Sequence, residues 1–180
     1  MYQRLENFLL EKGARYRVIT HHGAVTAQEQ AKESRTSGWK VAKVLIVKER
    51  DGYVMAVLPA ACVLDLNRLK GLIGHGEARL AEMEEIRSVI SDCVPGAIPP
   101  FGEMFGLRTF VDRSLLNTSE ITMPAGDLAT AIRMRSTEFR RIAGPRVGDF
   151  AAPEAFLKGG LKIPRRRTGG GGRSRLASRR

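Results

Sequence analysis

Lys43 is the side chain in this sequence with the clearest potential for chemistry, because it interrupts an otherwise apolar run. That run, Val41-Ala42-Lys43-Val44-Leu45-Ile46-Val47, is typical of a strand buried on both faces. Side chains alternate along a strand, which places Lys43 beside Leu45 and Val47. A lysine there either extends its ammonium group to an edge or holds it in a pocket against an anion or a polarised carbonyl, and both readings stay open.

A segment rich in proline and glycine is the second candidate for a site. It reads Pro95-Gly96-Ala97-Ile98-Pro99-Pro100-Phe101-Gly102. Its prolines and glycines exclude a helix or a paired strand, so we expect a shaped loop. Gly96 allows a ligand to approach the backbone amides and carbonyls of this loop. The alternative interpretation is a rigid crossover between a helix and a strand.

The histidines and cysteines show no metal-binding pattern. His21 and His22 end a predicted strand, where their imidazoles could bind phosphate, orient water or lie on the surface. There is no HExxH motif, and no Asp or Glu stands at a ligand spacing. Cys62 and Cys93 form neither a CxxC nor a CxxH pattern, so we expect reduced core residues. The sequence predicts neither a metal nor an organic cofactor.

The elements that must position these residues are short helices interleaved with short strands. Asp51-Gly52 is a hairpin signal between strands at 39–49 and 53–58. Asp65 and Ser136 are expected to cap helices, and Thr26 with Glu29 forms a capping box. We expect helices at 5–12, 27–34, 66–73, 83–90 and 137–142, and further strands at 15–20, 78–81, 109–112, 120–123 and 131–134. This pattern predicts an α+β domain whose mixed, strongly twisted, barrel-like β-sheet is surrounded by helices.

Charge divides the chain of 180 residues into two parts, 1–150 and 151–180. The whole chain carries 30 Lys and Arg against 19 Asp and Glu, a formal net charge of +11. Residues 151–180 hold nine basic residues and one acidic residue, which gives this tail a net charge of +8. From Pro164 onward, too few apolar side chains remain to offset the entropy of ordering, so we expect disorder.

The tail has an electrostatic interpretation, because each arginine that neutralises a phosphate releases counterions. Its candidate RNA contacts are Arg165, Arg166, Arg167, Arg173 and Arg175. A solubilising terminus is the alternative. No apolar run is long enough to span a membrane and the first twelve residues do not resemble a secretion signal, so we expect a cytoplasmic protein.

In their order along the chain, these segments resemble the YbaK and prolyl-tRNA-synthetase-associated domain family, whose members hydrolyse wrongly charged aminoacyl-tRNAs in trans. The resemblance covers about residues 5–151. It rests on His21-His22-Gly23-Ala24-Val25-Thr26-Ala27-Gln28-Glu29, on residues 41–47, on Ala56-Val57-Leu58-Pro59-Ala60, on residues 95–102, on Val111-Asp112 and on Ala125-Gly126.

The resemblance implies an editing pocket in which Lys43, Gly96 and Ala97 are catalytic. Lys43 would help to hold the 3′ end of the tRNA, while the glycine loop would position the ester and its attacking water or ribose hydroxyl. The implied substrate-binding residues are His21, Val25, Thr26, Leu45, Ile98, Pro99 and Gly126. The implied partners are mischarged tRNA and an aminoacyl-tRNA synthetase, with no cofactor.

Such an activity needs no side-chain nucleophile, because an aminoacyl ester is already activated and positioning with oxyanion stabilisation can suffice. Specificity would depend on pocket size, with walls such as Ile19, Val25, Leu45 and Ile98. One methylene group discriminates only about 10- to 200-fold.

Four positions depart from the family pattern and bear on which amino acid is removed. Pro124 stands where some relatives carry a serine, and Ile19 where some carry a tyrosine. Leu128 and Ala131 stand where relatives often place polar or acidic groups. The leading hypothesis is a free-standing deacylase of mischarged tRNA. The alternatives are a non-catalytic RNA-binding or regulatory module that retains the pocket, and a small-molecule sensor.

Overall fold

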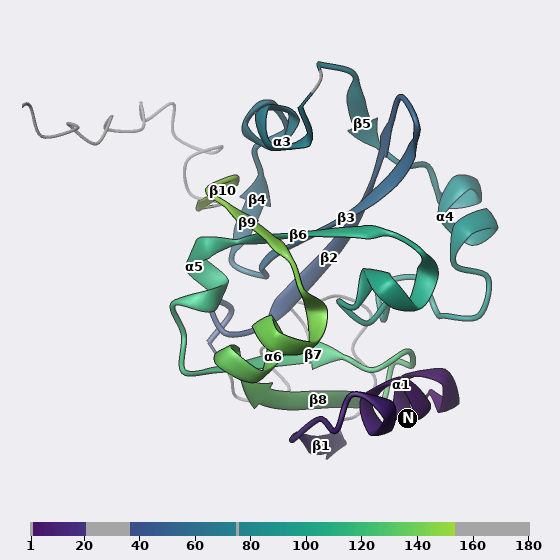
Figure 1. Cartoon of the computed structure of the whole chain (residues 1–180), viewed down its shortest axis with the longest axis vertical. Helices are drawn as coiled ribbons and strands as arrows, with labels where there is room; N and C mark the ends of the chain where they lie inside the picture. Colours follow the sequence, from purple (N-terminus) through teal and green to yellow (C-terminus); the bar gives the residue numbers. More distant parts are fainter. Residues whose placement is uncertain (1, 21–36, 75, 154–180) are drawn as a thin grey trace, which may run out of the picture.

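The computed structural model describes residues 2–20, 37–74 and 76–153 (Figure 1). Its helices are α1 (Gln3–Glu11), α3 (Leu66–Ile73), α4 (Met83–Val89), the 3-10 helix η1 (Gly102–Phe105), α5 (Arg113–Leu116) and α6 (Ser136–Ala143). Its strands are β1 (Arg17–Thr20), β2 (Ala42–Glu49), β3 (Gly52–Pro59), β4 (Cys62–Leu64), β5 (Ala78–Leu80), β6 (Arg108–Asp112), β7 (Glu120–Pro124), β8 (Thr130–Arg135), β9 (Arg146–Gly148) and β10 (Ala151–Pro153).

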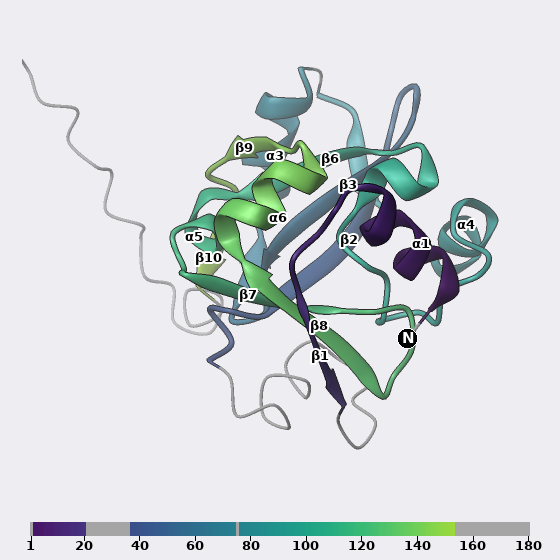
Figure 2. The same cartoon turned by 60° about the horizontal axis from the view of Figure 1, so that its bottom comes forward.

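The strands form a mixed sheet and two smaller antiparallel ones. The mixed sheet has the order β5-β2-β3-β6-β9, in which β3, β6 and β9 run parallel. The second sheet has the order β1-β8-β7 (Figure 2). The third consists of β10 paired with β4. A single bridge between Val41 and Thr122 links the first two sheets. The predicted α+β fold with a mixed sheet is confirmed, but the described strands form open sheets and do not close into a barrel.

The central hairpin forms as the sequence predicts. Strands β2 and β3 pair antiparallel from Ala42 opposite Pro59 to Glu49 opposite Gly52. The turn between them is formed by Arg50 and Asp51, one residue before the expected Asp51-Gly52, and Gly52 begins β3. Alternation then divides β2 between two cores. Ala42 and Ile46 face the larger core, whereas Val47 faces the smaller one.

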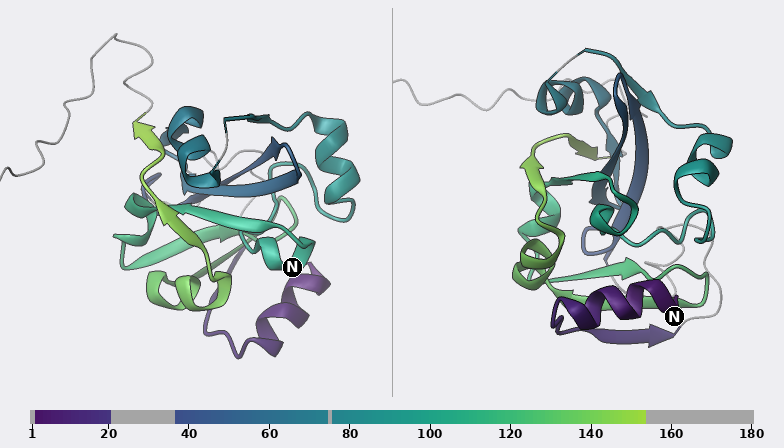
Figure 3. Two further views of the ribbon diagram at one scale, coloured as in Figure 1. Left: turned by 45° about the horizontal axis from the view of Figure 1, so that its top comes forward. Right: turned by 45° about the vertical axis from the view of Figure 1, so that its right-hand side comes forward.

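The larger core lies between the mixed sheet and the β1-β8-β7 sheet, and α1 and α6 contribute to it. Phe101 is fully buried there and packs against two other rings, with centroids 5.4 Å from Phe8 and 5.7 Å from Phe139. The smaller core covers the opposite face of β2 and β3, beneath α3. Figure 3 shows α3 and α4 on opposite sides of this hairpin. The loop of residues 95–102, which follows α4, therefore lies on the side of the larger core.

Local caps define several helix starts, and one of the predicted caps is wrong. Asp65 accepts a hydrogen bond from the Arg68 amide at 3.2 Å and caps α3 as predicted. Ser136 does not cap α6: it is the first helical residue, the cap position is held by Arg135, and the Ser136 amide donates to the Ser119 carbonyl. The tertiary contact with the preceding turn, rather than a hydroxyl, satisfies this helix end. The predicted helix at 27–34 and its capping box lie outside the described residues.

Asp112 organises short elements that sequence patterns did not reveal. Its buried carboxylate accepts from the Ser114 amide at 2.9 Å, which begins α5. It also accepts from the amides of Phe150 and Ala151, each at 2.7 Å, just before and at the start of β10. The first three residues of the expected tail, Ala151–Pro153, therefore pair with β4 as part of the fold.

Helix α6 fixes the connection between α1 and β1. Glu138 accepts from the Arg15 amide at 3.0 Å and pairs with Arg141 at 2.8 Å. Arg141 in turn donates to the Lys12 carbonyl at 3.1 Å. The Arg141 guanidinium, followed by the Arg15 amide, lowers the pKa of Glu138 to about 2. The ionised carboxylate thus holds β1 in place.

Glu138→Gln is expected to flatten the acid dependence of stability. In the wild type, the stabilisation by ionised Glu138 is present above its ordinary pKa of 4.5 and is lost as pH falls toward about 2. The effect should be at most about 1 kcal/mol, since Arg141 is half exposed. The free energy of unfolding is measured in urea between about pH 5 and pH 2, roughly the window set by these two pKa values. Glu11→Gln is the control. Parallel curves for wild type and Glu138→Gln would contradict the assignment.

Candidate functional site

The loop between α4 and η1 has the shaped, rigid form expected of residues 95–102. Ala97 and Ile98 are 2% and 6% exposed, and the prolines that follow are also buried. Gly96 is exposed and adopts a positive φ of 88°. The Ala97 amide donates to the Val94 carbonyl at 2.9 Å, which closes the turn around Gly96. The Gly96 backbone is therefore open to solvent, while the residues that follow it are buried in the protein.

A second predicted element, Gly126, joins this loop. The Gly126 amide donates to the Ala97 carbonyl at 2.8 Å, and its carbonyl accepts from the Val94 amide at 3.3 Å. Gly126 is buried between β7 and β8 with φ of 93°, a conformation that favours glycine. The structure thus brings Gly96, Ala97 and Gly126 together.

Tyr2 supports Gly126 from the other side, and sequence reasoning missed it. A Cβ added at Gly126 would meet the Tyr2 side chain, with Tyr2 Cγ at 2.7 Å. The Tyr2 amide donates to the Ala125 carbonyl at 3.2 Å, and its hydroxyl donates to Asp92, which also pairs with Arg4. Desolvation and the hydrogen bond to Asp92 raise the pKa of Tyr2. No local motif marks a contact across ninety residues, so nothing in the sequence pattern points to it.

The cysteines are poor nucleophiles. Burial raises the pKa of both Cys62 and Cys93 to about 11, so each is a protonated thiol at neutral pH. This agrees with their interpretation as reduced core residues. Among the described residues, no three His, Cys, Asp or Glu side chains gather in a way that could hold a metal ion.

Lys43 lies on β2 opposite Leu58, on the same face as Leu45. Its half-buried ammonium group donates to the Cys62 carbonyl at the start of β4. Leu45 packs against the smaller core, whereas Ile98 belongs to the larger one. The structure therefore places Lys43 and Leu45 on the face of β2 opposite Ile98.

Three of the four departures lie in one row. Ile19 of β1 is the register partner of Ala131 in β8, and Ala131 is the partner of Pro124 in β7. Ala131 and Pro124 are buried, and Ile19 is half buried. Ile132, the next residue of β8, belongs to the larger core. Because side chains alternate along a strand, the row lies on the opposite face of the β1-β8-β7 sheet. Leu128 stands apart, in the turn after Gly126.

Several predicted site residues fall outside the described part of the chain. They are His21, Val25, Thr26 and the tail arginines Arg165, Arg166, Arg167, Arg173 and Arg175. Across the residues that the structure does describe, no helix has both the length and the apolar character to cross a membrane.

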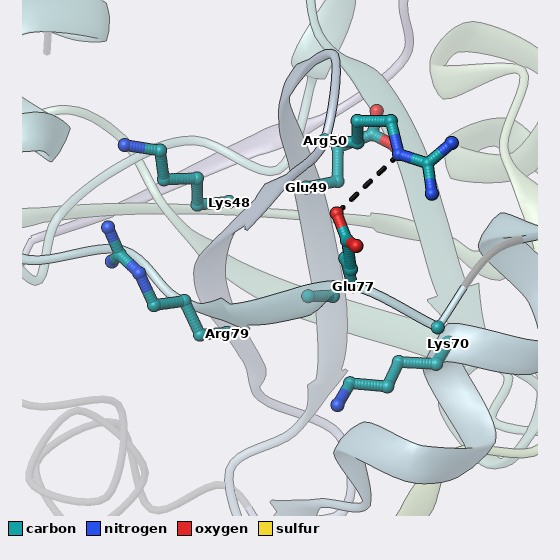
Figure 4. A pocket seen from close by; sticks show the side chains of 8 residues that line it. Lys48, Glu49, Arg50, Lys70, Glu77 and Arg79 are labelled. Carbon is teal, nitrogen blue, oxygen red and sulfur yellow. Dashed lines mark ion pairs between the residues drawn. The ribbon is translucent and has the colours of Figure 1, made fainter.

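A cavity of about 380 Å³ opens at the far end of the β2–β3 hairpin, away from the loop (Figure 4). Its cations are largely compensated. Arg50 pairs with Glu77 at 3.5 Å, while Lys48 and Arg79 both pair with Glu85, at 2.6 and 2.7 Å. Hydrogen bonds from Arg79 and Lys48 lower the pKa of Glu85 well below its ordinary value. Three of the four cations that line the cavity are thus paired with acids, and Lys70 is the fourth.

The sequence profile of the aminoacyl-tRNA editing domain matches residues 21–142. The chain is 32% identical over 154 residues to the multifunctional Ser/Thr-tRNA deacylase ProXp-y of Escherichia coli K12. This alignment covers 83% of the present chain and 92% of the deacylase. It is also 43% identical over 47 residues to a proline–tRNA ligase of Thermosipho africanus, 26% of this chain and 8% of the ligase.

Among solved structures, one described as a candidate trans-editing enzyme for prolyl-tRNA synthetase superimposes with a TM-score of 0.75 at 24% identity, covering 84% of this chain and 96% of that one. That likeness shows a shared fold. The profile match and the relative that aligns over most of both chains go further, and this chain belongs to the aminoacyl-tRNA editing domain family.

Proposed function

We propose that the chain is a free-standing deacylase that hydrolyses the ester bond of mischarged aminoacyl-tRNA. Membership of the editing-domain family carries this proposal, since a relative that covers most of the chain is named a Ser/Thr-tRNA deacylase. The junction of Gly96, Ala97 and Gly126 supports it, because a fixed loop with exposed backbone can position an activated ester. The place of action would be the cytoplasm, where charged tRNA is used.

Gly96 and Ala97 would have different roles. The amide and the carbonyl of Ala97 are both used, by Val94 and Gly126, so Ala97 acts as a positioning residue. Gly96 is exposed, and its backbone is the part of the loop that substrate can reach. A backbone donor aimed at the developing oxyanion is worth about 10²- to 10³-fold in rate. Gly96 is therefore the catalytic position of the loop, and water or a ribose hydroxyl supplies the attacking oxygen.

Lys43 would hold the 3′ end of the tRNA. The Cys62 carbonyl orients its ammonium group, which is half buried and therefore less screened than a surface lysine. An ammonium group of this kind binds a phosphate as a point charge. Because Lys43 lies on the face of β2 away from Ile98, it would act on the RNA rather than on the aminoacyl side chain.

The row of Ile19, Ala131 and Pro124 would form one wall of the aminoacyl pocket. Its members are apolar and adjacent, so a polar side chain would find no hydrogen-bond partner there. We expect a small apolar amino acid such as alanine to be removed faster than serine or threonine. The proposed partner is an aminoacyl-tRNA synthetase. Prolyl-tRNA synthetase is the first one to test, because part of a proline–tRNA ligase aligns with this chain.

The test is deacylation of a panel that carries Ala, Ser, Thr or Cys on tRNA for proline, with correctly charged Pro-tRNA as the control. Hydrolysis of one or more mischarged members, with the cognate ester spared, supports the proposal and names the substrate. If no member is hydrolysed while tRNA still binds, the non-catalytic RNA-binding module replaces it.

The basic tail is expected to add affinity that depends on salt. Deletion of residues 164–180 removes the five candidate arginine contacts, and each lost phosphate contact should lower the slope of log affinity against log salt by about 0.7 to 0.9. Binding of uncharged tRNA at several salt concentrations measures this slope. An unchanged slope in the truncated protein would leave the tail as a solubilising terminus.

A further inference from the structure

A second cavity, of about 430 Å³, lies on the β1-β8-β7 sheet and is lined by arginines from two strands. We call it the arginine groove, and it is defined by Arg15, Arg17, Arg133, Arg135, Glu120 and Glu138. Arg17 and Arg133 are directly opposite in the antiparallel register of β1 and β8. Sequence reasoning did not find this cluster, because the two strands are more than a hundred residues apart.

The acids of the groove do not neutralise it. Arg17 pairs with Glu120 at 2.7 Å, but the carboxylate of Glu138 already binds Arg141 from outside the groove. Four arginines thus face two glutamates, one of which is shared with a fifth cation.

The groove is also partly preorganised. Arg133 is half buried and its Nε donates to the Oγ1 of Thr122 at 2.9 Å. Thr122 is itself 1% exposed on β7, so this bond orients the guanidinium plane. A planar guanidinium held in this way matches the oxygens of a phosphate in a bidentate arrangement.

Its position connects the groove with the proposed aminoacyl pocket. Ala131 and Arg133 are two residues apart on β8, on the same face, which is a distance of about 7 Å along the strand. The apolar row containing Ala131 therefore continues directly into the arginine pair.

We propose that the arginine groove binds backbone phosphates of the tRNA whose ester is hydrolysed next to it. This inference rests on the proposed function. An RNA backbone supplies a row of anions, which a row of arginines along two strands can contact without reading sequence. The groove would thus align the tRNA along the β1-β8-β7 sheet, with its charged end toward the row of Ile19, Ala131 and Pro124.

The experiment compares two double variants of the full chain that lose the same charge. Arg17→Gln with Arg135→Gln removes two exposed arginines of the groove. Arg50→Gln with Lys70→Gln, in the other cavity, is the control. Uncharged tRNA binding is measured over a range of salt, together with kcat and KM for deacylation and the melting temperature.

For the groove variant we expect a roughly tenfold weaker Kd, a slope against log salt lower by about 1.4 to 1.8, and a rise in KM larger than any fall in kcat. The control should stay close to wild type. Equal effects in both variants, or none in the groove variant, would overturn the inference. Weaker tRNA binding by the groove variant, in a protein that hydrolyses no panel member, would support the groove and reject the deacylase. If the groove binds polyglutamate in place of tRNA, the proposal that it is an RNA-binding site is wrong.

Discussion

Replacing Lys43 by alanine is expected to lower kcat/KM for deacylation by about 100- to 1000-fold, the loss typical of removing one partner of a desolvated charge pair between protein and ligand. The structure holds its ammonium group against the Cys62 carbonyl, half buried and on a rigid hairpin. A cation fixed there can bind the 3′ end of the tRNA without the entropy loss of ordering a free side chain. Single-turnover deacylation of the preferred panel member measures the effect.

Lys48→Ala is the matched control, since Lys48 lies on the same strand but pairs with Glu85 at 2.6 Å. It should retain most of the activity. Loss of the hydrogen bond to Cys62 should destabilise the Lys43→Ala protein by only about 1 kcal/mol, and thermal melting verifies that it remains folded. If Lys43→Ala keeps its kcat/KM, the proposed role of this lysine is wrong. If Lys43→Arg restores affinity for tRNA but not turnover, the ammonium group acts on the reacting ester.

The parts of the fold that were predictable from sequence depend on local signals. The hairpin around Asp51-Gly52 and the cap at Asp65 formed as predicted, because turn and cap chemistry act over a few residues. The alternation along β2 also predicted the face of Lys43. It did not predict the Cys62 carbonyl as its partner, because that contact requires the path of the chain after the hairpin.

The rest of the site depends on pairing between distant segments. The opposition of Arg17 and Arg133, and the row from Ile19 to Pro124, exist only in the register of β1, β8 and β7. No periodicity within one strand carries that register. For the same reason Ser136 was wrongly expected to cap α6: a long-range bond to Ser119 decides how that helix begins.

Gly126→Ala is expected to destabilise the protein by about 2 to 5 kcal/mol and to lower its activity at temperatures where it is folded. Backbone strain at φ of 93° contributes about 1 to 3 kcal/mol, and overpacking against Tyr2 contributes a similar amount. At about 2 to 4 °C per kcal/mol, the melting temperature should fall by roughly 4 to 20 °C. Because the Gly126 amide fixes the Ala97 carbonyl, kcat/KM should fall as well.

Gly13→Ala separates the two contributions to this loss of stability. Gly13 also has a positive φ, 57°, but a Cβ there would meet nothing within 4 Å, so only strain of about 1 to 2 kcal/mol is expected. Tyr2→Gly removes the atoms that a methyl group at Gly126 would meet. In that background, Gly126→Ala should have about the effect of Gly13→Ala, and a double-mutant cycle gives the coupling. Full additivity of Tyr2→Gly and Gly126→Ala would show that the two residues do not press on each other. Strong coupling that also appears in kcat/KM would mean that the N-terminal tyrosine holds the loop in its working position, through Gly126 and Ala97.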